Sequence, residues 1–478
     1  MVFNLLLVAD YFMLLNFHGN FNQDAVDIIM DTNPGESAEF LNTYLNWWKA
    51  TLWIAGVVAF NVASWKAAKC TYKYISGNKI VTAVACVILG AAGCYIGKCA
   101  WNYLRYADGM SITQCNSLVR AAYAWHIAMQ NLQIYENIVR NNTDIAARAA
   151  EDAPRNVVVV IGESHSVFHS QLYGYKKNTE PLMSELRDKG SLTVMKDAIT
   201  PWDRTTKALA SIFSTSGAIR GLTASPVFPQ LFRKAGYRTV MLDNQCVAGG
   251  GTSVNGDRGL SEAMFNERNT RLYPYDEDML QLLDSVRSQD PTLYVIHLMG
   301  QHYTYSERYP RDASNSVFSS TDYPDSISEE IRSRRAHYDN ATLHTDRNLR
   351  SIINHFRDKD CAVIYFSDHG EELGEDGFGH GYAASSSMID RQIRVPMWIW
   401  LSDSFREKRP EMASRVARAS TLRITTDDVS QAILSLGGIE TPFYDPKRSF
   451  LSGDYDSTRT RIAIQSIDFD RASKAAFE

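Results

Sequence analysis

The sequence lacks the features that mark several common classes of protein. Its seven cysteines form no Cys-x-x-Cys pair and no cluster with histidine at zinc-finger spacing, which argues against a zinc-finger or disulfide scaffold. Basic residues are not in excess, with 49 Lys and Arg against 54 Asp and Glu, which argues against a broadly basic nucleic-acid binder. No phosphate-binding P-loop is present. A hydrophobic fraction of 45% suffices for a buried core.

The first hundred residues differ in composition from the rest of the chain. Residues 50–65 and 80–97 hold no charged side chain and are flanked by lysines. With their flanks, both runs approach the length of about 20 residues that a membrane-spanning helix needs. We therefore expect spans near 47–65 and 80–99. Residues 1–17 are also apolar but carry Asp10, so we expect a partial span there. They lack the basic start and the cleavage site of a signal peptide.

The loops around these runs predict a direction across the membrane. The loop between the two clear runs carries lysines and no acidic residue, as cytoplasmic loops do, whereas the loop before them carries only acidic charges. We expect a membrane domain over 1–100, amphipathic or linker helices over 101–150, and an extracytoplasmic domain over 151–478. The alternative is that both runs are buried helices of a soluble protein.

From residue 155 onward, short β-branched and aromatic runs alternate with helical patterns. This alternation predicts an α/β fold with a mostly parallel sheet sandwiched by helices. Ligands of such sheets bind beyond the carboxyl ends of the strands. The expected strands lie at 156–164, 237–245, 292–300, 361–370 and 395–401, and the expected helices at 180–189, 204–214, 276–288 and 326–355.

Polar residues follow these runs where a ligand would bind. Asp368 and His369 come directly after a buried run, and Glu163 ends another run in the same way. Zn²⁺ accepts such a mixed set of carboxylate and imidazole ligands, with a position left for a nucleophile or water. Asn244 ends a third run, where it either contacts a substrate head group together with Gln245 or belongs to a turn.

His297 lies inside an apolar run, so we expect it to be a satisfied core histidine. Ser164 follows Glu163, but its flanks lack the G-x-S-x-G form of a serine nucleophile.

Four motifs occur in order along this domain: IGESHSVFHSQLYGYKKNTEPLM, TPWDRTTKALASIFS, HLMGQHYTYSERYP and SDHGEELGEDGFGHG. Together they resemble the motif series of the phosphoethanolamine transferases, membrane members of the alkaline phosphatase/sulfatase superfamily. The resemblance covers residues 150–470 and implies an alkaline phosphatase-like fold preceded by transmembrane helices. The family has more such helices than the apolar runs found here, so we expect part of the membrane domain to be missing.

The resemblance also implies roles for particular residues. Thr205 is expected to be the nucleophile, with Thr206 as the alternative. His302 and His380 are expected to contact the substrate phosphate and to take part in proton transfer. A zinc ion is expected on Glu163, Thr205, Asp368 and His369.

The implied reaction moves phosphoethanolamine from phosphatidylethanolamine, through a covalent phospho-threonine, to a glycolipid or glycan acceptor such as lipid A or lipopolysaccharide core. The implied location is the bacterial inner membrane, multi-pass, with the catalytic domain in the periplasm. Members that modify lipid A carry cysteines where this chain has Pro201 and Ser211. Cys246 and Cys361 are the domain's only cysteines, so the family's set of disulfides cannot form.

Two alternatives remain open from the sequence. One is a phosphoglycerol transferase of the lipoteichoic-acid-synthase type, and the other is a non-catalytic envelope protein with the same fold. The sequence has no Cys/Ser-x-Pro-x-Arg motif, which argues against a sulfatase with a formylglycine nucleophile.

Overall fold

The structure is a computed structural model that describes residues 6, 8–13, 47–75, 79–105, 145–217, 225–245, 264–269, 272–286, 289–374, 386–464 and 467–472. The chain divides into two compact units, Met1–Gln133 and Ile134–Glu478. Each unit is described by itself.

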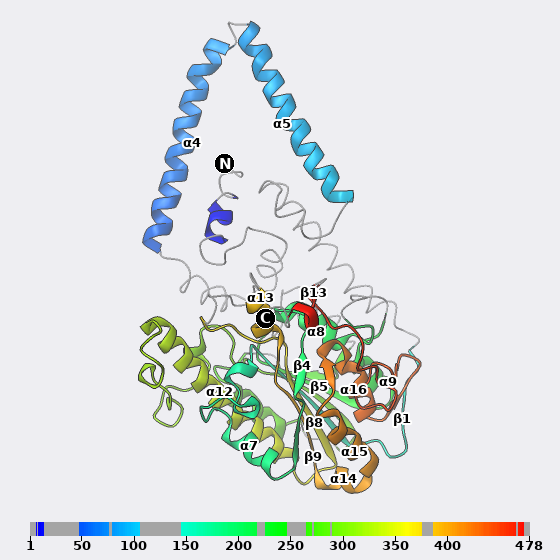
Figure 1. Ribbon diagram of the computed structural model, residues 1–478. Helices are drawn as coiled ribbons and strands as arrows, with labels where there is room; N and C mark the ends of the chain where they lie inside the picture. Colours follow the sequence, from blue (N-terminus) through cyan, green and yellow to red (C-terminus); the bar gives the residue numbers. More distant parts are fainter. Residues whose placement is uncertain are drawn as a thin grey trace. The chain divides into compact units, whose positions relative to one another are not determined.

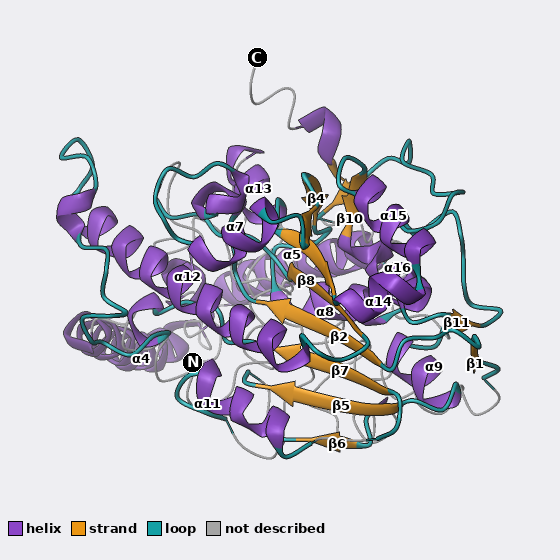
Figure 2. Cartoon of the chain, turned by 90° about the horizontal axis from the view of Figure 1, so that it is seen from below, coloured by secondary structure: helices purple, strands orange, loops and turns teal. Residues whose placement is uncertain are grey.

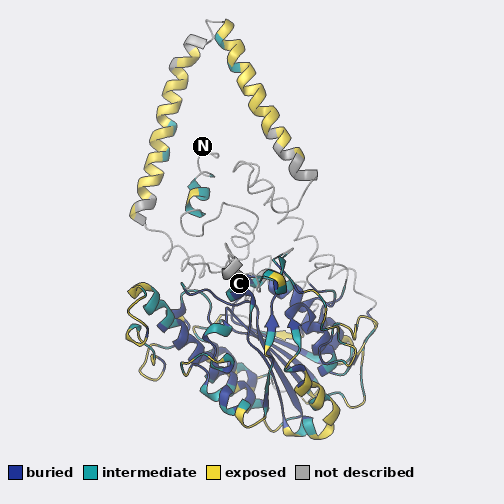
Figure 3. Ribbon diagram, viewed as in Figure 1, coloured by how far each residue is buried: buried dark blue, intermediate teal, exposed yellow. Residues whose placement is uncertain are grey.

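Two long helices dominate the first unit, α4 (Trp47–Ile75) and α5 (Lys79–Arg105) (Figure 1). Their large apolar side chains are exposed, with Phe60 64% and Leu89 72% accessible (Figure 3). Apolar surface on this scale is typical of a face that contacts lipid or another protein. These exposed faces agree with the apolar runs from which membrane spans were expected.

Within the described part of the chain, one helical segment is long and apolar enough to cross a membrane, Thr51–Lys69 in α4. It overlaps the span expected near 47–65. The span expected near 80–99 falls in α5, whose apolar part, Lys79–Tyr95, is shorter. Of the partial span over 1–17, residues 6 and 8–13 are described, and they are helical.

The second unit is built on a seven-stranded sheet with the order β3-β9-β8-β2-β7-β5-β6 (Figure 2). Its strands are β2 (Asn156–Gly162), β3 (Leu192–Val194), β5 (Arg238–Asp243), β6 (Glu267–Arg268), β7 (Thr292–His297), β8 (Cys361–Ser367) and β9 (Met397–Leu401). Strands β8, β2, β7, β5 and β6 run parallel. The mostly parallel sheet predicted from the sequence is therefore present.

Strand β9 departs from the parallel pattern expected for 395–401, because it runs antiparallel to β8 and β3. The reason lies in the connection. The chain leaves β8, forms α13 (Ser386–Ile393), and returns beside the end of β8, where Ser367 N donates to Pro396 O at 3.2 Å. Because this connection begins and ends at the same end of the strands, the next strand must run antiparallel to β8.

Helices cover both faces of the sheet (Figure 2). Alternate residues of β2 explain why, since Val157, Val159 and Ile161 pack in one apolar core and Val158 and Val160 in the other. The first core includes side chains of α8 (Thr205–Phe213), α9 (Phe228–Lys234), α14 (Asp403–Lys408), α15 (Pro410–Ala419) and α16 (Val429–Leu436). The second core includes side chains of α7 (Pro181–Asp188), α11 (Asp276–Leu280) and α12 (Glu329–Phe356).

Smaller elements complete the unit. Three two-stranded pairs are β1 (Arg148–Ala149) with β11 (Ile439–Glu440), β4 (Asp197–Ile199) with β10 (Arg423–Thr425), and β12 (Ile462–Ala463) with β13 (Ile467–Asp468). Short 3₁₀ turns are η1 (Val167–His169), η2 (Gln171–Tyr173), η4 (Gln281–Asp284), η5 (Tyr305–Glu307), η6 (Ser320–Asp322) and η7 (Thr426–Asp428). The helix expected over 276–288 is thus divided between α11 and η4.

Candidate active site

Three of the expected ligands come together beyond the ends of neighbouring strands. In the sheet, Gly162 of β2 pairs with Ser367 of β8, so the residues that follow these two strands emerge side by side. Glu163, Asp368 and His369 are all buried, and one ligand atom from each lies within 4.8 Å of the others. The sheet register therefore builds a compact group of two carboxylates and one imidazole.

The Glu163 carboxylate is the hydrogen-bonding centre of this group. Its Oε1 accepts from Ser164 Oγ at 2.7 Å and lies 3.2 Å from His369 Nε2. Its Oε2 accepts from Thr205 Oγ1 at 3.0 Å and from Gln245 Nε2 at 2.9 Å. These contacts hold the carboxylate in a single orientation, as expected of a group that must present one oxygen to a ligand. Ser164 thus supports Glu163.

Asp368 contributes a carboxylate oxygen suited to a metal. Its Oδ1 accepts from His369 N at 2.7 Å and Ser164 N at 3.2 Å. Its Oδ2 is buried and has no hydrogen-bond partner among the residues that the structure describes. Burial, together with repulsion from Glu163, raises the pKa of Asp368 to about 7. His369 Nε2 lies 3.6 Å from this oxygen, beyond hydrogen-bonding distance. A buried carboxylate oxygen without a hydrogen bond is costly, and a cation bound there lowers the cost.

The ring of His369 is oriented by its backbone. Its Nδ1 lies 2.7 Å from Gly370 O, so Nδ1 carries a proton and Nε2 faces Glu163 and Asp368. Burial alone would lower the pKa of His369, but the two carboxylates raise it well above its ordinary value. Although burial alone would raise the pKa of Glu163, this imidazole lowers it well below its ordinary value. Two carboxylates and one imidazole fit Zn²⁺ in charge and ligand type.

Thr205 is the first residue of α8, and its hydroxyl reaches the cluster through Glu163. The position also places it at the positive end of the helix dipole, which favours negative charge on this oxygen or on a phosphate beside it. Thr206, the alternative nucleophile, lies in α8, and its side chain falls outside the described residues.

His302 is brought to the site by a turn that wraps the backbone of Glu163. Gln301 N donates to Glu163 O at 3.1 Å, and His302 N donates to Met299 O at 3.0 Å. Gly300 has a φ of +49°, and an added Cβ would lie 3.1 Å from both Glu163 N and Glu163 O. His302 is half-buried, and its charge helps to lower the pKa of Glu163. His380 lies outside the described residues.

Asn244 is fully buried and is held at both ends of its amide. Its Nδ2 donates to Asp276 Oδ1 at 2.9 Å, and its Oδ1 accepts from Tyr273 N at 2.8 Å. These contacts favour the turn alternative over contact with a substrate head group. The neighbouring Gln245 instead reaches the site, where its Nε2 bridges Glu163 and the carbonyl of Leu298, the latter at 2.7 Å.

His297 is buried, as the sequence suggested, and it lies at the end of the sheet where the cluster forms. It ends β7 next to β2, and its Nδ1 contacts Asp243 Oδ1 at 3.0 Å. Its Nε2 is buried with no hydrogen-bond partner in the described part of the chain. Burial alone would lower its pKa, but Asp243, Glu163 and Asp368 raise it. His297 lay inside the strand expected over 292–300, so the sequence did not show that β7 ends at this residue.

The mostly parallel sheet and the carboxylate and imidazole group at its strand ends define an α/β fold of the alkaline phosphatase type, and comparison with known proteins agrees. A model of the sulfatase family matches residues 155–439, and the chain belongs to this family. Among curated proteins it is similar to "Phosphoethanolamine transferase EptC" of Escherichia coli O18:K1:H7, with 24% identity over 465 residues that cover 92% of this chain and 79% of the relative.

Two solved structures share the fold. The C-terminal periplasmic domain of Escherichia coli EptC, in complex with Zn, aligns with a TM-score of 0.59 and 23% identity, covering 68% of this chain and 96% of that one. The integral membrane protein lipooligosaccharide phosphoethanolamine transferase A of Neisseria meningitidis aligns with a TM-score of 0.68 and 21% identity, covering 94% and 85%. The alkaline phosphatase-like fold and the resemblance to phosphoethanolamine transferases expected from the sequence are confirmed.

Proposed function

We propose that this chain is a membrane-bound transferase that moves phosphoethanolamine from phosphatidylethanolamine to a glycolipid or glycan of the bacterial envelope, either lipid A or lipopolysaccharide core. The observation that carries the proposal is the Thr205 hydroxyl held 3.0 Å from a carboxylate of the buried Glu163, Asp368 and His369 group. The similarity of this chain to proteins named as phosphoethanolamine transferases, one of them solved in complex with Zn, supports both the reaction and the metal.

The cofactor in this proposal is Zn²⁺, held by Glu163, Thr205, Asp368 and His369. When bound, zinc supplies a Lewis acid that lowers the pKa of the threonine hydroxyl and draws charge from the phosphate oxygens. The chain prepares the site, since Gln245 and Ser164 fix the Glu163 carboxylate while Gly370 fixes the His369 ring.

The reaction takes two steps at Thr205. In the first, Thr205 Oγ1 gives up its proton and forms a bond to the donor phosphorus, while the phosphorus–oxygen bond to diacylglycerol breaks and that oxygen gains a proton. In the second, an acceptor hydroxyl gives up its proton as its oxygen bonds to phosphorus, the Thr205–phosphorus bond breaks, and Thr205 Oγ1 regains a proton. His302 and His380 are suited to contact the phosphate and to carry these protons.

The proposed location is the bacterial inner membrane, with a multi-pass membrane domain over 1–100, linker helices over 101–150, and the catalytic domain over 151–478 in the periplasm. The apolar segment Thr51–Lys69 supports membrane attachment. A donor lipid in the same bilayer would then lie within reach of the catalytic domain.

A Thr205→Ala variant tests the proposal. We expect that the variant still binds zinc through Glu163, Asp368 and His369 and loses diacylglycerol release by about 10³-fold or more, with partial activity in Thr205→Ser. Full activity of Thr205→Ala would refute the assigned nucleophile. Mass spectrometry of envelope glycolipids from cells with and without the protein identifies the acceptor. A phosphoglycerol increment in place of phosphoethanolamine would refute the assigned reaction.

A further inference from the structure

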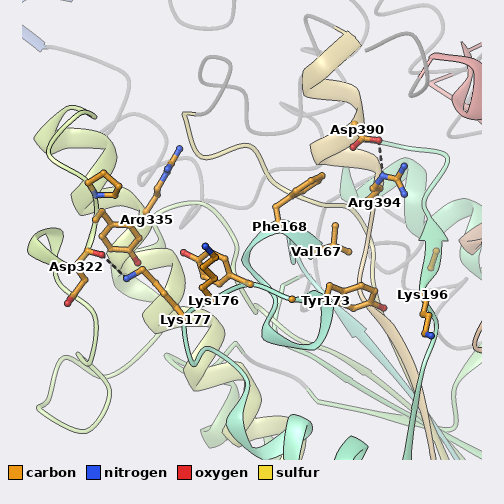
Figure 4. Close-up of a pocket in the computed structure, with 15 residues that line it drawn as sticks. Val167, Phe168, Tyr173, Lys176, Lys177, Lys196, Asp322, Arg335, Asp390 and Arg394 are labelled. Atoms are coloured by element: carbon orange, nitrogen blue, oxygen red, sulfur yellow. Dashed lines mark hydrogen bonds and ion pairs between the residues drawn. The ribbon is translucent and has the colours of Figure 1, made fainter. Parts of the chain in front are cut away.

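A cleft of 790 Å³ in the second unit has a charge opposite to that of the whole chain. The chain carries a formal charge of −5, but the cleft is lined by five cationic side chains and two carboxylates (Figure 4). The cationic residues are Lys176, Lys177, Lys196, Arg335 and Arg394, and the acidic residues are Asp322 and Asp390. Such a concentration of positive charge attracts an anionic ligand.

The two carboxylates of the cleft are already engaged. Asp390 Oδ1 accepts from Arg394 Nε at 2.8 Å, and the Asp322 carboxylate accepts from Ser319 N at 2.7 Å within its own turn. Lys177 donates to the Asp322 carbonyl at 2.8 Å. By contrast, the ammonium groups of the exposed Lys176 and Lys196 make no ion pair or hydrogen bond with any residue that the structure describes.

Aromatic rings lie between these two lysines. Figure 4 shows Phe168 and Tyr173 between Lys176 on one side and Lys196 on the other. The Tyr173 hydroxyl is occupied, since it donates to Met195 O at 2.7 Å, so its ring is the part available to a ligand. An aromatic surface flanked by cations suits a sugar ring that carries anionic groups.

Two segments that line the cleft are connected to segments of the candidate active site. Val167 and Phe168 follow Glu163 along the chain, after a turn, and both line the cleft. On the other side, Gly370 N, directly after His369, donates to Gln392 O at 2.7 Å in α13, the helix that carries Asp390. The cleft is therefore lined by segments that are joined directly to those that carry the cluster.

We propose that this cleft binds the anionic sugar of the acceptor, with Lys176 and Lys196 each holding a phosphate or carboxylate group. The inference rests on the proposed function and names the acceptor class, a sugar with negative charge at more than one position. A two-step reaction at one threonine needs a place for a second substrate, and the cleft supplies one with matching charge.

The test uses the full chain in detergent, with the double variant Lys176→Gln/Lys196→Gln. The matched control is Lys234→Gln/Lys447→Gln, which removes the same charge from exposed positions outside the cleft. We expect the KM for the glycolipid acceptor to rise about tenfold in the cleft variant and to stay unchanged in the control. Diacylglycerol release without acceptor should stay within about twofold of the wild type, and the difference in KM should shrink at high salt.

An unchanged acceptor KM would overturn the inference, and so would an equal loss in the donor step, because the cleft would then hold the donor phosphate. A binding measurement separates this inference from the proposed reaction. A bisphosphorylated glucosamine disaccharide and a digalacturonate should show whether phosphate or carboxylate is preferred, with a neutral disaccharide as control. Charge-dependent binding that the cleft variant loses supports the inference even if no transfer occurs. Equal binding by variant and wild type, or no binding by the wild type, refutes it.

Discussion

Gln245 offers the sharpest test of how the chain prepares its metal site. Its Nε2 donates to Glu163 Oε2 at 2.9 Å and to Leu298 O at 2.7 Å. Gln245→Leu removes both hydrogen bonds with little change in side-chain volume. Glu163 Oε2 then accepts one hydrogen bond fewer, and the Glu163 side chain gains freedom to rotate. We therefore expect weaker zinc binding together with lower stability.

The magnitude follows from the two contacts that are lost. A hydrogen bond to a charged group contributes about 1.5–3 kcal/mol, and one to a neutral carbonyl about 1 kcal/mol. Groups that orient a metal ligand change metal affinity by about 10- to 100-fold. Oε2 of Glu163 keeps the Thr205 hydroxyl as a donor at 3.0 Å, so we expect a loss of zinc affinity near tenfold. The two lost bonds together should lower the free energy of unfolding by about 3 kcal/mol.

Zinc affinity is measured by competition with a chelator of known strength, and stability by urea unfolding of the metal-free protein. Gln431→Leu is the matched control, because Gln431 is equally buried and its Nε2 donates to two carbonyls, Thr215 O at 2.9 Å and Phe443 O at 3.1 Å. The control should lose stability while its zinc affinity stays at the wild-type value. Equal zinc affinity in the wild type and Gln245→Leu would refute the reasoning.

Three further substitutions test separate parts of the catalytic domain. Gly300→Ala forces a Cβ to within 3.1 Å of the Glu163 backbone at a φ of +49°, so we expect a loss of about 1–2 kcal/mol in urea unfolding and slower diacylglycerol release. Asp360→Asn breaks a buried pair with Arg409 (2.7 and 3.1 Å). Burial alone would raise the pKa of Asp360, but Arg409 lowers it, so the loss of about 3 kcal/mol should be complete above about pH 4 and should fade as acid protonates the wild-type carboxylate. Burial raises the pKa of Glu180 to about 7, so its contribution to stability is present below its unfolded pKa and is lost as pH rises through 7. The stability of Glu180→Gln relative to the wild type should therefore rise by about 2 kcal/mol between pH 5 and pH 8. Equal pH profiles of unfolding free energy for the two proteins would contradict this.

The sequence was sufficient to locate five strands of the seven-stranded sheet, because each of these is an apolar run that is largely buried. Residues 156–162 and 361–367 are buried almost throughout their length, and a fully buried strand leaves an unmistakable pattern. The direction of β9 could not be predicted from the sequence, because the hydrophobic pattern of a strand carries no information on its direction. That direction depends on α13, which returns the chain to the edge of the sheet that it has just left.

The sequence predicted the part of the candidate site whose residues directly follow the strands. Glu163, Asp368 and His369 were recognisable because neighbouring parallel strands end at the same edge. The contact between Gln245 and Glu163 could not be predicted in the same way, because β7 separates β5 from β2. Only the strand order shows that the Gln245 side chain reaches Glu163. His297 is buried, as its apolar neighbours predicted, but those neighbours did not show that β7 ends at this residue.

The register of β2, β7 and β8 explains why the cluster can be rigid while residues of the cleft tolerate substitution. Gly162 pairs with Ser367, and Ile161 pairs with His297. The backbone extends this register past the strand ends, since Asp368 N donates to Gly162 O at 3.0 Å and Leu298 N donates to Ile161 O at 3.0 Å. A slip of one residue in any of these strands would turn the cluster away from Thr205. The lysines of the cleft lie on connecting segments outside this ladder, so substitutions there should alter the choice of acceptor and leave the metal site intact.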